Sequence, residues 1–245
     1  MTPVEFIQKI NKQYGSAAWA LVDEFRAHMG KDLPKWPPHV FLPYGGWYAV
    51  ACHVLQKAYL STDEIITMQE ISIAGTWRVT QDIVSFSPGL YNKLISTPVQ
   101  GDLAAEILFR LPAWCVYIET PGMDFNGMLI QGFWALLEQD VNNGEDELRL
   151  YLWTGSNAIS HPLHIGKWNL HEAINRMNQT IGFFVDGMAM PSSPIIEQCV
   201  SLTLHLCTHG FTGYPEQIRY PQPQKTKNGL RIFPAQKPVV HTIGD

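Results

Sequence analysis

The chain has 245 residues, of which 46% are hydrophobic and 16% are charged, and its formal net charge is −5. This length is enough for one substantial hydrophobic core. No apolar run approaches the ~18 residues that a membrane span needs, and the amino-terminal residues lack the basic and apolar segments of a secretory signal. We therefore expect a cytoplasmic protein with no membrane partner.

The charge is unevenly distributed along the chain. Residues 219–245 hold five basic residues and one acidic residue, whereas the rest of the chain holds 12 basic and 21 acidic residues. An acidic body does not offer the positive surface that nucleic acids require, but it suits a basic protein or peptide. The basic end is the one feature of the sequence that supports contact with RNA.

The first half of the chain is predicted to be rich in helix. Thr2, Pro3 and Glu5 are typical of a helix start, with a capping box and a proline in the first turn. Apolar residues then recur every three or four positions up to Gly30. The proline-rich link KDLPKWPPHVFLPYGG that follows cannot form regular helix. Further helices are predicted at 47–59, 63–77, 90–95 and 103–109.

The middle of the chain is predicted to form strands. Four segments are rich in β-branched and aromatic residues and are separated by turn signals, at 113–119, 127–138, 147–154 and 158–165. Because the links between them are short, we expect an antiparallel meander of about four strands. Helices return at 169–182 and 195–209, and two short extended pieces follow near the end.

These elements predict an α+β fold, in which a central antiparallel sheet is flanked by helices. We expect a single globular domain over residues 1–218. Residues 219–245 are expected to form a proline-rich basic carboxy-terminal segment that packs on this domain or leads away from it.

The cysteines and histidines offer little chemistry. Cys115 lies within an apolar strand, whereas a reactive thiol needs an accessible, electropositive setting. His205 and His209 share one face of a predicted helix and could form one edge of a metal site, while His161 and His164 are expected on opposite faces of a strand. No GxSxG elbow or phosphate-binding loop is present. We therefore expect no catalytic residue, metal or cofactor, and a metal-dependent hydrolase stays an alternative.

Several stretches together resemble one family. They are PPHVFLPYGG at 37–46, ISIAGTWRVTQDIVSF at 71–86, ILFRLPAWCVYIET at 107–120 and IQGFWALLEQD at 130–140, followed by LTLHLCTHG and KNGLRIFPAQKPVVHTIGD. In this order they resemble the type V-A anti-CRISPR family that blocks biosynthesis of the type V-A RNA-guided effector nuclease. The pair LPAWCVY and GFWA is the most specific element, and the resemblance spans nearly the whole chain.

The resemblance implies a binding protein that acts in the bacterial host cell and is not an enzyme. Members of this family are understood to recognise the amino-terminal polypeptide of the effector as it leaves the ribosome, after which the translating mRNA is lost. The implied partner is this peptide, with the translating ribosome or the mRNA as further partners. An acidic body rich in aromatic residues suits such a peptide. The candidate peptide-binding residues lie in the family-like stretches and are Tyr44, Trp47, Trp77, Arg78 and Trp134.

Two other interpretations stay open. The candidate residues could recur because they build the core, as large aromatic residues usually do, or the protein could be an RNA-binding regulator that acts directly on mRNA through its basic end. The family members that it resembles continue past the HTIGD-like element into a basic extension, whereas this sequence ends at Asp245. If that extension engages RNA or the ribosome, we expect this chain to bind the peptide without silencing the effector.

Overall fold

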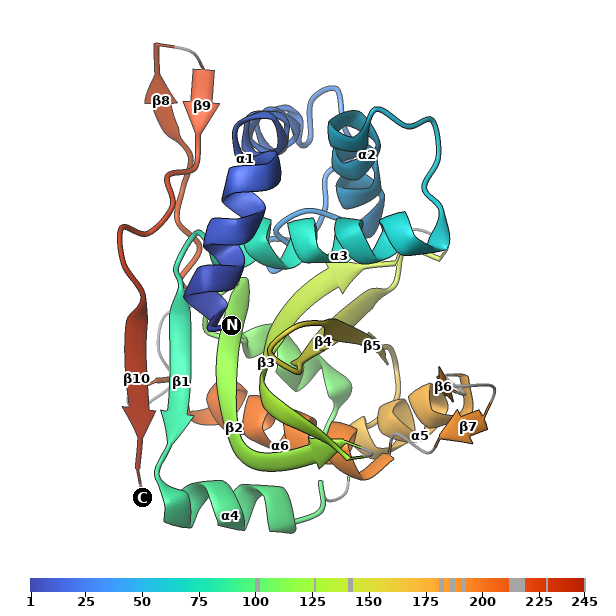
Figure 1. Ribbon diagram of the computed structural model, residues 1–245. Coiled ribbons are helices and arrows are strands. Elements are labelled where there is room, and N and C mark those ends of the chain that lie inside the picture. Colours follow the sequence, from blue (N-terminus) through green and yellow to red (C-terminus); the bar gives the residue numbers. More distant parts are fainter. Residues whose placement is uncertain are drawn as a thin grey trace.

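The computed structural model describes residues 1–99, 102–125, 127–140, 143–180, 183–185, 188–190, 193–211, 219–227 and 229–244. A six-stranded sheet lies between two layers of helices (Figure 1). Helices α1, α2 and α3 cover one face of the sheet, and α4, α5 and α6 lie on the other side. None of the helices within the described ranges combines the length and apolar character of a membrane span.

The first helical layer consists of α1 (Pro3–His28), α2 (Tyr44–Leu55) and α3 (Thr62–Trp77). The capping box predicted at Thr2 and Glu5 is confirmed: in α1 the Glu5 N–H donates to the Thr2 hydroxyl oxygen (3.2 Å) and the Thr2 N–H donates to the Glu5 carboxylate (2.7 Å). Helix α2 starts and ends earlier than predicted. Its end is set by Gln56, whose φ of 55° lies in the left-handed region and stops the helix.

The sheet contains β1 (Asp82–Phe86), β2 (Cys115–Phe125), β3 (Met128–Gln139), β4 (Asp146–Trp153), β5 (Ala158–Ile165) and β10 (Val239–Ile243), in the order β10-β1-β2-β3-β4-β5. Strands β2 to β5 form the predicted antiparallel meander. The prediction of a four-stranded, purely antiparallel sheet is wrong, because β1 pairs in parallel with both β2 and β10. The α+β class holds, with a mixed sheet of six strands.

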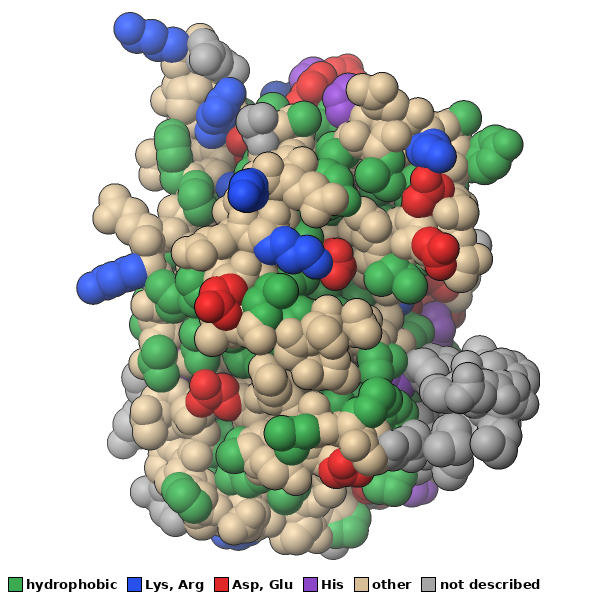
Figure 2. Space-filling view, in the orientation of Figure 1, with side chains coloured by type: hydrophobic (Ala, Val, Ile, Leu, Met, Phe, Trp, Pro, Cys, Tyr) green, Lys and Arg blue, Asp and Glu red, His purple; other side chains and the backbone are tan. Residues whose placement is uncertain are grey.

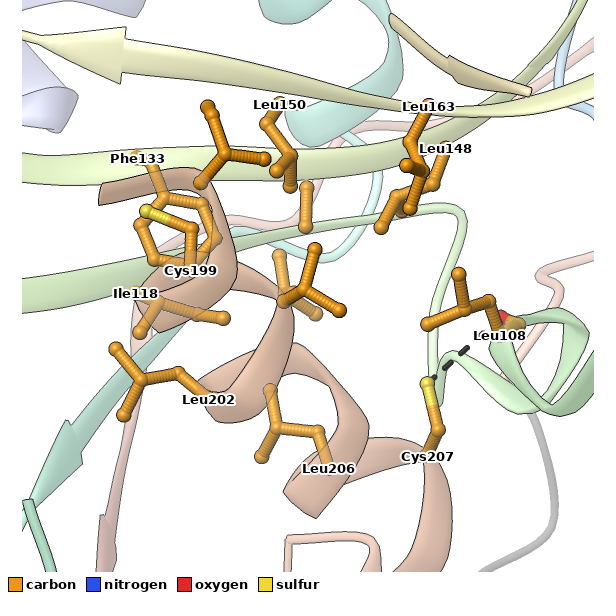
Figure 3. Packing of buried hydrophobic residues seen from close by; sticks show 14 of the residues in the cluster. Leu108, Ile118, Phe133, Leu148, Leu150, Leu163, Cys199, Leu202, Leu206 and Cys207 are labelled. Carbon is orange, nitrogen blue, oxygen red and sulfur yellow. Dashed lines mark hydrogen bonds between the residues drawn. The ribbon is translucent and has the colours of Figure 1, made fainter. Parts of the chain in front are cut away.

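The second helical layer consists of α4 (Pro88–Ser96), the 3₁₀ helix η1 (Ala105–Arg110), α5 (Leu170–Thr180) and α6 (Ser193–His209). The last two residues of the predicted helix 169–182 lie outside the described residues. Alternate residues of the strands point into this layer, where Phe133, Leu150 and Leu163 belong to one buried cluster with Leu202 and neighbouring residues of α6 (Figure 3). Two further short strands, β6 (Phe183–Val185) and β7 (Met188–Met190), pair with each other.

The carboxy-terminal residues form a hairpin and an edge strand. Strands β8 (Gln224–Thr226) and β9 (Gly229–Arg231) make a hairpin that projects beyond α1 (Figure 1), and Lys and Arg side chains stand out on it (Figure 2). Strand β10 then joins the sheet, where the buried Asp82 carboxylate accepts from His241 Nε2 (2.8 Å) and pairs with Arg219 Nη2 (2.5 Å). The division of the chain at residue 218 stays a prediction.

Candidate functional site

The three predicted tryptophans lie in the core under the first helical layer. Trp47, Trp77 and Trp134 are each at most 1% exposed. The rings of Trp77 and Trp134 meet edge to face with centroids 6.2 Å apart, and Trp77 Nε1 donates to the Asp82 carbonyl oxygen at 2.8 Å. Side chains so enclosed do not reach a peptide on the surface. We therefore assign them to the core, which corrects their selection as peptide contacts.

Arg78 is also buried, and it holds the carboxy-terminal segment against α1. Its Nη1 donates to the Ile232 carbonyl oxygen at 3.1 Å, and its Nη2 lies 3.7 Å from the Asp23 carboxylate. Burial lowers the pKa of Arg78 to about 10, although Asp23 opposes this shift. The role of Arg78 in the structure is therefore to tie two distant segments together.

Tyr44 is the one predicted residue that stays partly exposed. It begins α2 and lines a polar cavity of about 220 Å³ together with charged residues of the sheet. The Arg149 guanidinium lies over its ring, 5.2 Å from the centroid. Burial raises the pKa of Tyr44, with a smaller opposing effect of Arg149. Tyr44 thus marks a surface that the other four candidates do not reach.

An apolar groove of about 410 Å³ adjoins this polar cavity. One wall comes from the end of α1 and the proline-rich link, with Phe25 and Trp36, and the other from the start of α2, with Ala49. The groove ends at the β3–β4 turn, where Asp140 lines both cavities. The prolines of the link exclude a regular helix there, and the link instead runs through turns, one of them closed by the Val40 N–H donating to the Pro37 carbonyl oxygen at 3.0 Å.

Close packing of the link against α2 depends on a glycine. A Cβ on Gly46 would come within 2.7 Å of the Leu42 side chain, whereas real Cβ atoms stay beyond 3.0 Å. The YGG start of α2 therefore lets the link pack tightly against the helix that forms the groove wall.

Beneath the polar cavity lies a buried group of charges that sequence reasoning missed. Glu138, Glu147 and Arg149 are 1%, 1% and 9% exposed. Arg149 Nε lies 2.8 Å from Glu138, and its Nη2 donates to Glu147. Ser72 of α3 donates to the other Glu138 oxygen at 2.7 Å. These contacts compensate charges that would otherwise be costly to bury.

The pKa shifts in this group follow from burial and mutual attraction. Burial raises the pKa of Glu138, and Arg149 opposes that rise. Burial disfavours the charged form of Arg149, yet the surrounding anionic groups raise its pKa above the ordinary value. The ion pairs therefore keep Arg149 charged inside the protein.

The strand register explains how these residues come together. Glu138 of β3 is paired with Glu147 of β4, and Glu147 is paired with His164 of β5. Directly paired residues point to the same face of a sheet. The sequence signal was a charge at alternate positions of apolar strands, in ALLEQD and in ELRLYL. The pairing itself could not be read from the sequence.

The other chemical candidates are separated or enclosed. His205 and His209 stack with centroids 4.3 Å apart, but they are not part of the close group of His, Cys, Asp and Glu ligand atoms found in the described residues. His161 packs against Phe125 in the second helical layer, on the face opposite to His164, as predicted. Burial raises the pKa of the Cys115 thiol well above its ordinary value, so this cysteine is not poised to react.

Comparisons with known proteins indicate a single family. The model of the AcrVA2-like family, described as the anti-CRISPR type V subtype A2 family, matches residues 84–245. The fold is similar to the crystal structure of AcrVA2, with a TM-score of 0.74 and 18% sequence identity over 98% of this chain and 83% of that chain. A search of curated proteins found no match. The family match includes Asp140, Glu147 and His164, whereas the α1 and α2 walls of the groove precede it.

Proposed function

This chain belongs to the AcrVA2-like family of type V subtype A2 anti-CRISPR proteins, and we propose that it suppresses a type V-A effector nuclease by binding the nascent amino-terminal polypeptide of that effector. The translating mRNA is then lost, so that the effector does not accumulate. In this proposal the protein acts by binding and carries out no catalysis of its own.

The observation that carries the proposal is the apolar groove beside the acidic cavity. Phe25 and Ala49, which are at least partly exposed, contribute apolar surface to the groove, while Asp140 places a carboxylate at its end. A short extended peptide binds well where apolar side chains enter a groove and a basic side chain meets carboxylates. The bound segment would therefore carry apolar residues close to a lysine or arginine, which would lie near Asp140 and the adjoining polar cavity that Tyr44 lines.

Binding is tested with overlapping peptides that cover the effector sequence, measured by fluorescence anisotropy. One strong hit at the amino terminus is expected. Ala49→Trp fills the groove from an exposed helical position, whereas Ala17→Trp makes the same change at an exposed position of α1 outside the groove. We expect Ala49→Trp to weaken binding at least about ten-fold, which corresponds to about 1.4 kcal/mol, and Ala17→Trp to bind normally. Absence of any peptide hit would contradict the proposal.

A second candidate function, contact with RNA, is favoured by the projecting hairpin. Lys225, Lys227 and Arg231 are exposed on or beside β8 and β9. These residues would meet the mRNA or the ribosome near a peptide held by the body. RNA affinity that falls steeply with salt, and falls further when the three are replaced by serine, would support this function. Undetectable RNA binding at low salt would end it.

A further inference from the structure

Three potential metal ligands meet in the polar cavity. Asp140, Glu147 and His164 each offer one ligand atom, and these atoms lie within 4.8 Å of one another. Asp140 follows directly after β3, Glu147 belongs to β4 and His164 to β5, so three neighbouring strands supply them. From this placement we propose that the cavity binds one divalent transition-metal ion.

His164 carries the feature that points to a ligand. Its Nδ1 is buried and has no hydrogen-bond partner among the described residues. The Glu147 carboxylate oxygen lies 3.7 Å from it, beyond hydrogen-bond distance. The His164 side chain as a whole is 32% exposed, and a metal ion beside Glu147 would accept the lone pair of this nitrogen. The cavity of about 220 Å³ leaves space for the ion and its waters.

The local charge favours a cation. Arg149 pairs with both Glu138 and Glu147, and Asp140 adds a third carboxylate at the edge of the cavity. This concentration of carboxylates attracts a divalent cation by Coulombic interaction.

The geometry requires only a small adjustment of side chains. Bonds from a metal ion to histidine nitrogen and carboxylate oxygen are about 2.0–2.2 Å long, so two ligands of one ion lie at most about 4.4 Å apart. Glu147 is fixed by Arg149, whereas Asp140 and His164 are partly exposed and can turn toward the ion. One imidazole with two carboxylates suits ions such as Zn²⁺, Co²⁺ or Mn²⁺, while Ca²⁺ and Mg²⁺ prefer oxygen ligands alone.

The ion would also stiffen the groove. Asp140 lines the apolar groove as well as the polar cavity. Joining Asp140 to β5 through a metal ion would hold the β3–β4 turn in place. This site does not depend on the identity of the peptide, so it can be tested without one.

The experiment uses the full chain without a polyhistidine tag, freed of metal by a chelator. Calorimetric titration with ZnCl₂ is expected to show one ion per chain, and CoCl₂ is expected to give visible absorption bands of a bound ion. We expect His164→Ala and Asp140→Asn each to weaken zinc binding at least about ten-fold. The controls His171→Ala and Asp102→Asn change an exposed histidine and an exposed aspartate elsewhere and are expected to bind as the unchanged protein does.

Each outcome decides the proposal. Circular dichroism without metal shows whether the variants keep their fold, and the cobalt spectrum of the unchanged protein tests the site even if a variant does not fold. Loss of binding in the two cavity variants alone supports the site. No stoichiometric binding by the unchanged protein, or equal binding by folded His164→Ala, overturns it.

Discussion

Replacing Arg149 with methionine should destabilise the fold strongly. The substitution keeps an apolar stem but removes the cation that pairs with Glu138 at 2.8 Å and with Glu147. Both carboxylates are 1% exposed, so water does not replace the lost partner. Breaking a buried ion pair from one side costs about 3–5 kcal/mol. For a chain of this size we expect a fall in Tm of about 6–20 °C.

The pH dependence of the lost stability gives a second, independent test of the role of Arg149. Burial raises the pKa of Glu138, and Arg149 opposes that rise. Because Arg149→Met removes this opposing charge, we expect the Glu138 pKa to rise further in the variant. A carboxyl group whose pKa is higher in the folded state than in the unfolded state contributes to the free energy of unfolding. This contribution is complete below the unfolded-state pKa of about 4.3, and it is lost as the pH rises through the folded-state pKa. The destabilisation should therefore be smaller at about pH 5 than at about pH 8.

Urea denaturation at the two pH values measures both effects. Arg176→Met is the matched control, because Arg176 is exposed and lies over the Trp168 ring at 4.4 Å, a contact that contributes about 0.5–1 kcal/mol. A loss below about 1 kcal/mol for Arg149→Met, or a larger loss at the lower pH, would refute the reasoning.

Two further predictions concern packing and thiol reactivity. Gly75→Ala should cost about 1–3 kcal/mol in urea denaturation, because its Cβ would lie 2.5 Å from the Trp47 ring. Gly15→Ala should be neutral or stabilising by up to about 1 kcal/mol, since its closest contact is 3.5 Å; equal costs would contradict this packing. A thiol reagent should label Cys52 alone in the native protein, since burial raises the thiol pKa of the other three cysteines. Rapid labelling of Cys115 would contradict this prediction.

The local elements of the fold could be predicted because their signals are local. Capping boxes, turn residues and alternating apolar residues mark α1, α3 and the strands from β2 to β5. Strand β1 has only five residues, and its partner β10 lies far along the chain between prolines and the end. Parallel pairing leaves no short-range turn to read. The two missing strands therefore could not be placed from the sequence.

The candidate site shows the same limit. Trp47, Trp77 and Trp134 were selected for their aromatic character, yet that character also builds cores, and the fold uses it there. Tyr44 was selected because it lies in the family-like stretch PPHVFLPYGG, and its position at the start of α2 is seen only in the structure. Asp140, Glu147 and His164 come together only through strand register, which the order of residues does not reveal.

Crosslinking to a ribosome–nascent chain complex tests the central claim most directly. A photoreactive amino acid is placed at Ala49, inside the groove, or at Ala17, outside it. The complex displays either the amino terminus of the effector or the same residues in scrambled order. We predict a crosslink from position 49 to the native nascent chain alone. Equal crosslinking to the scrambled chain, or from position 17, would contradict recognition of the peptide in this groove.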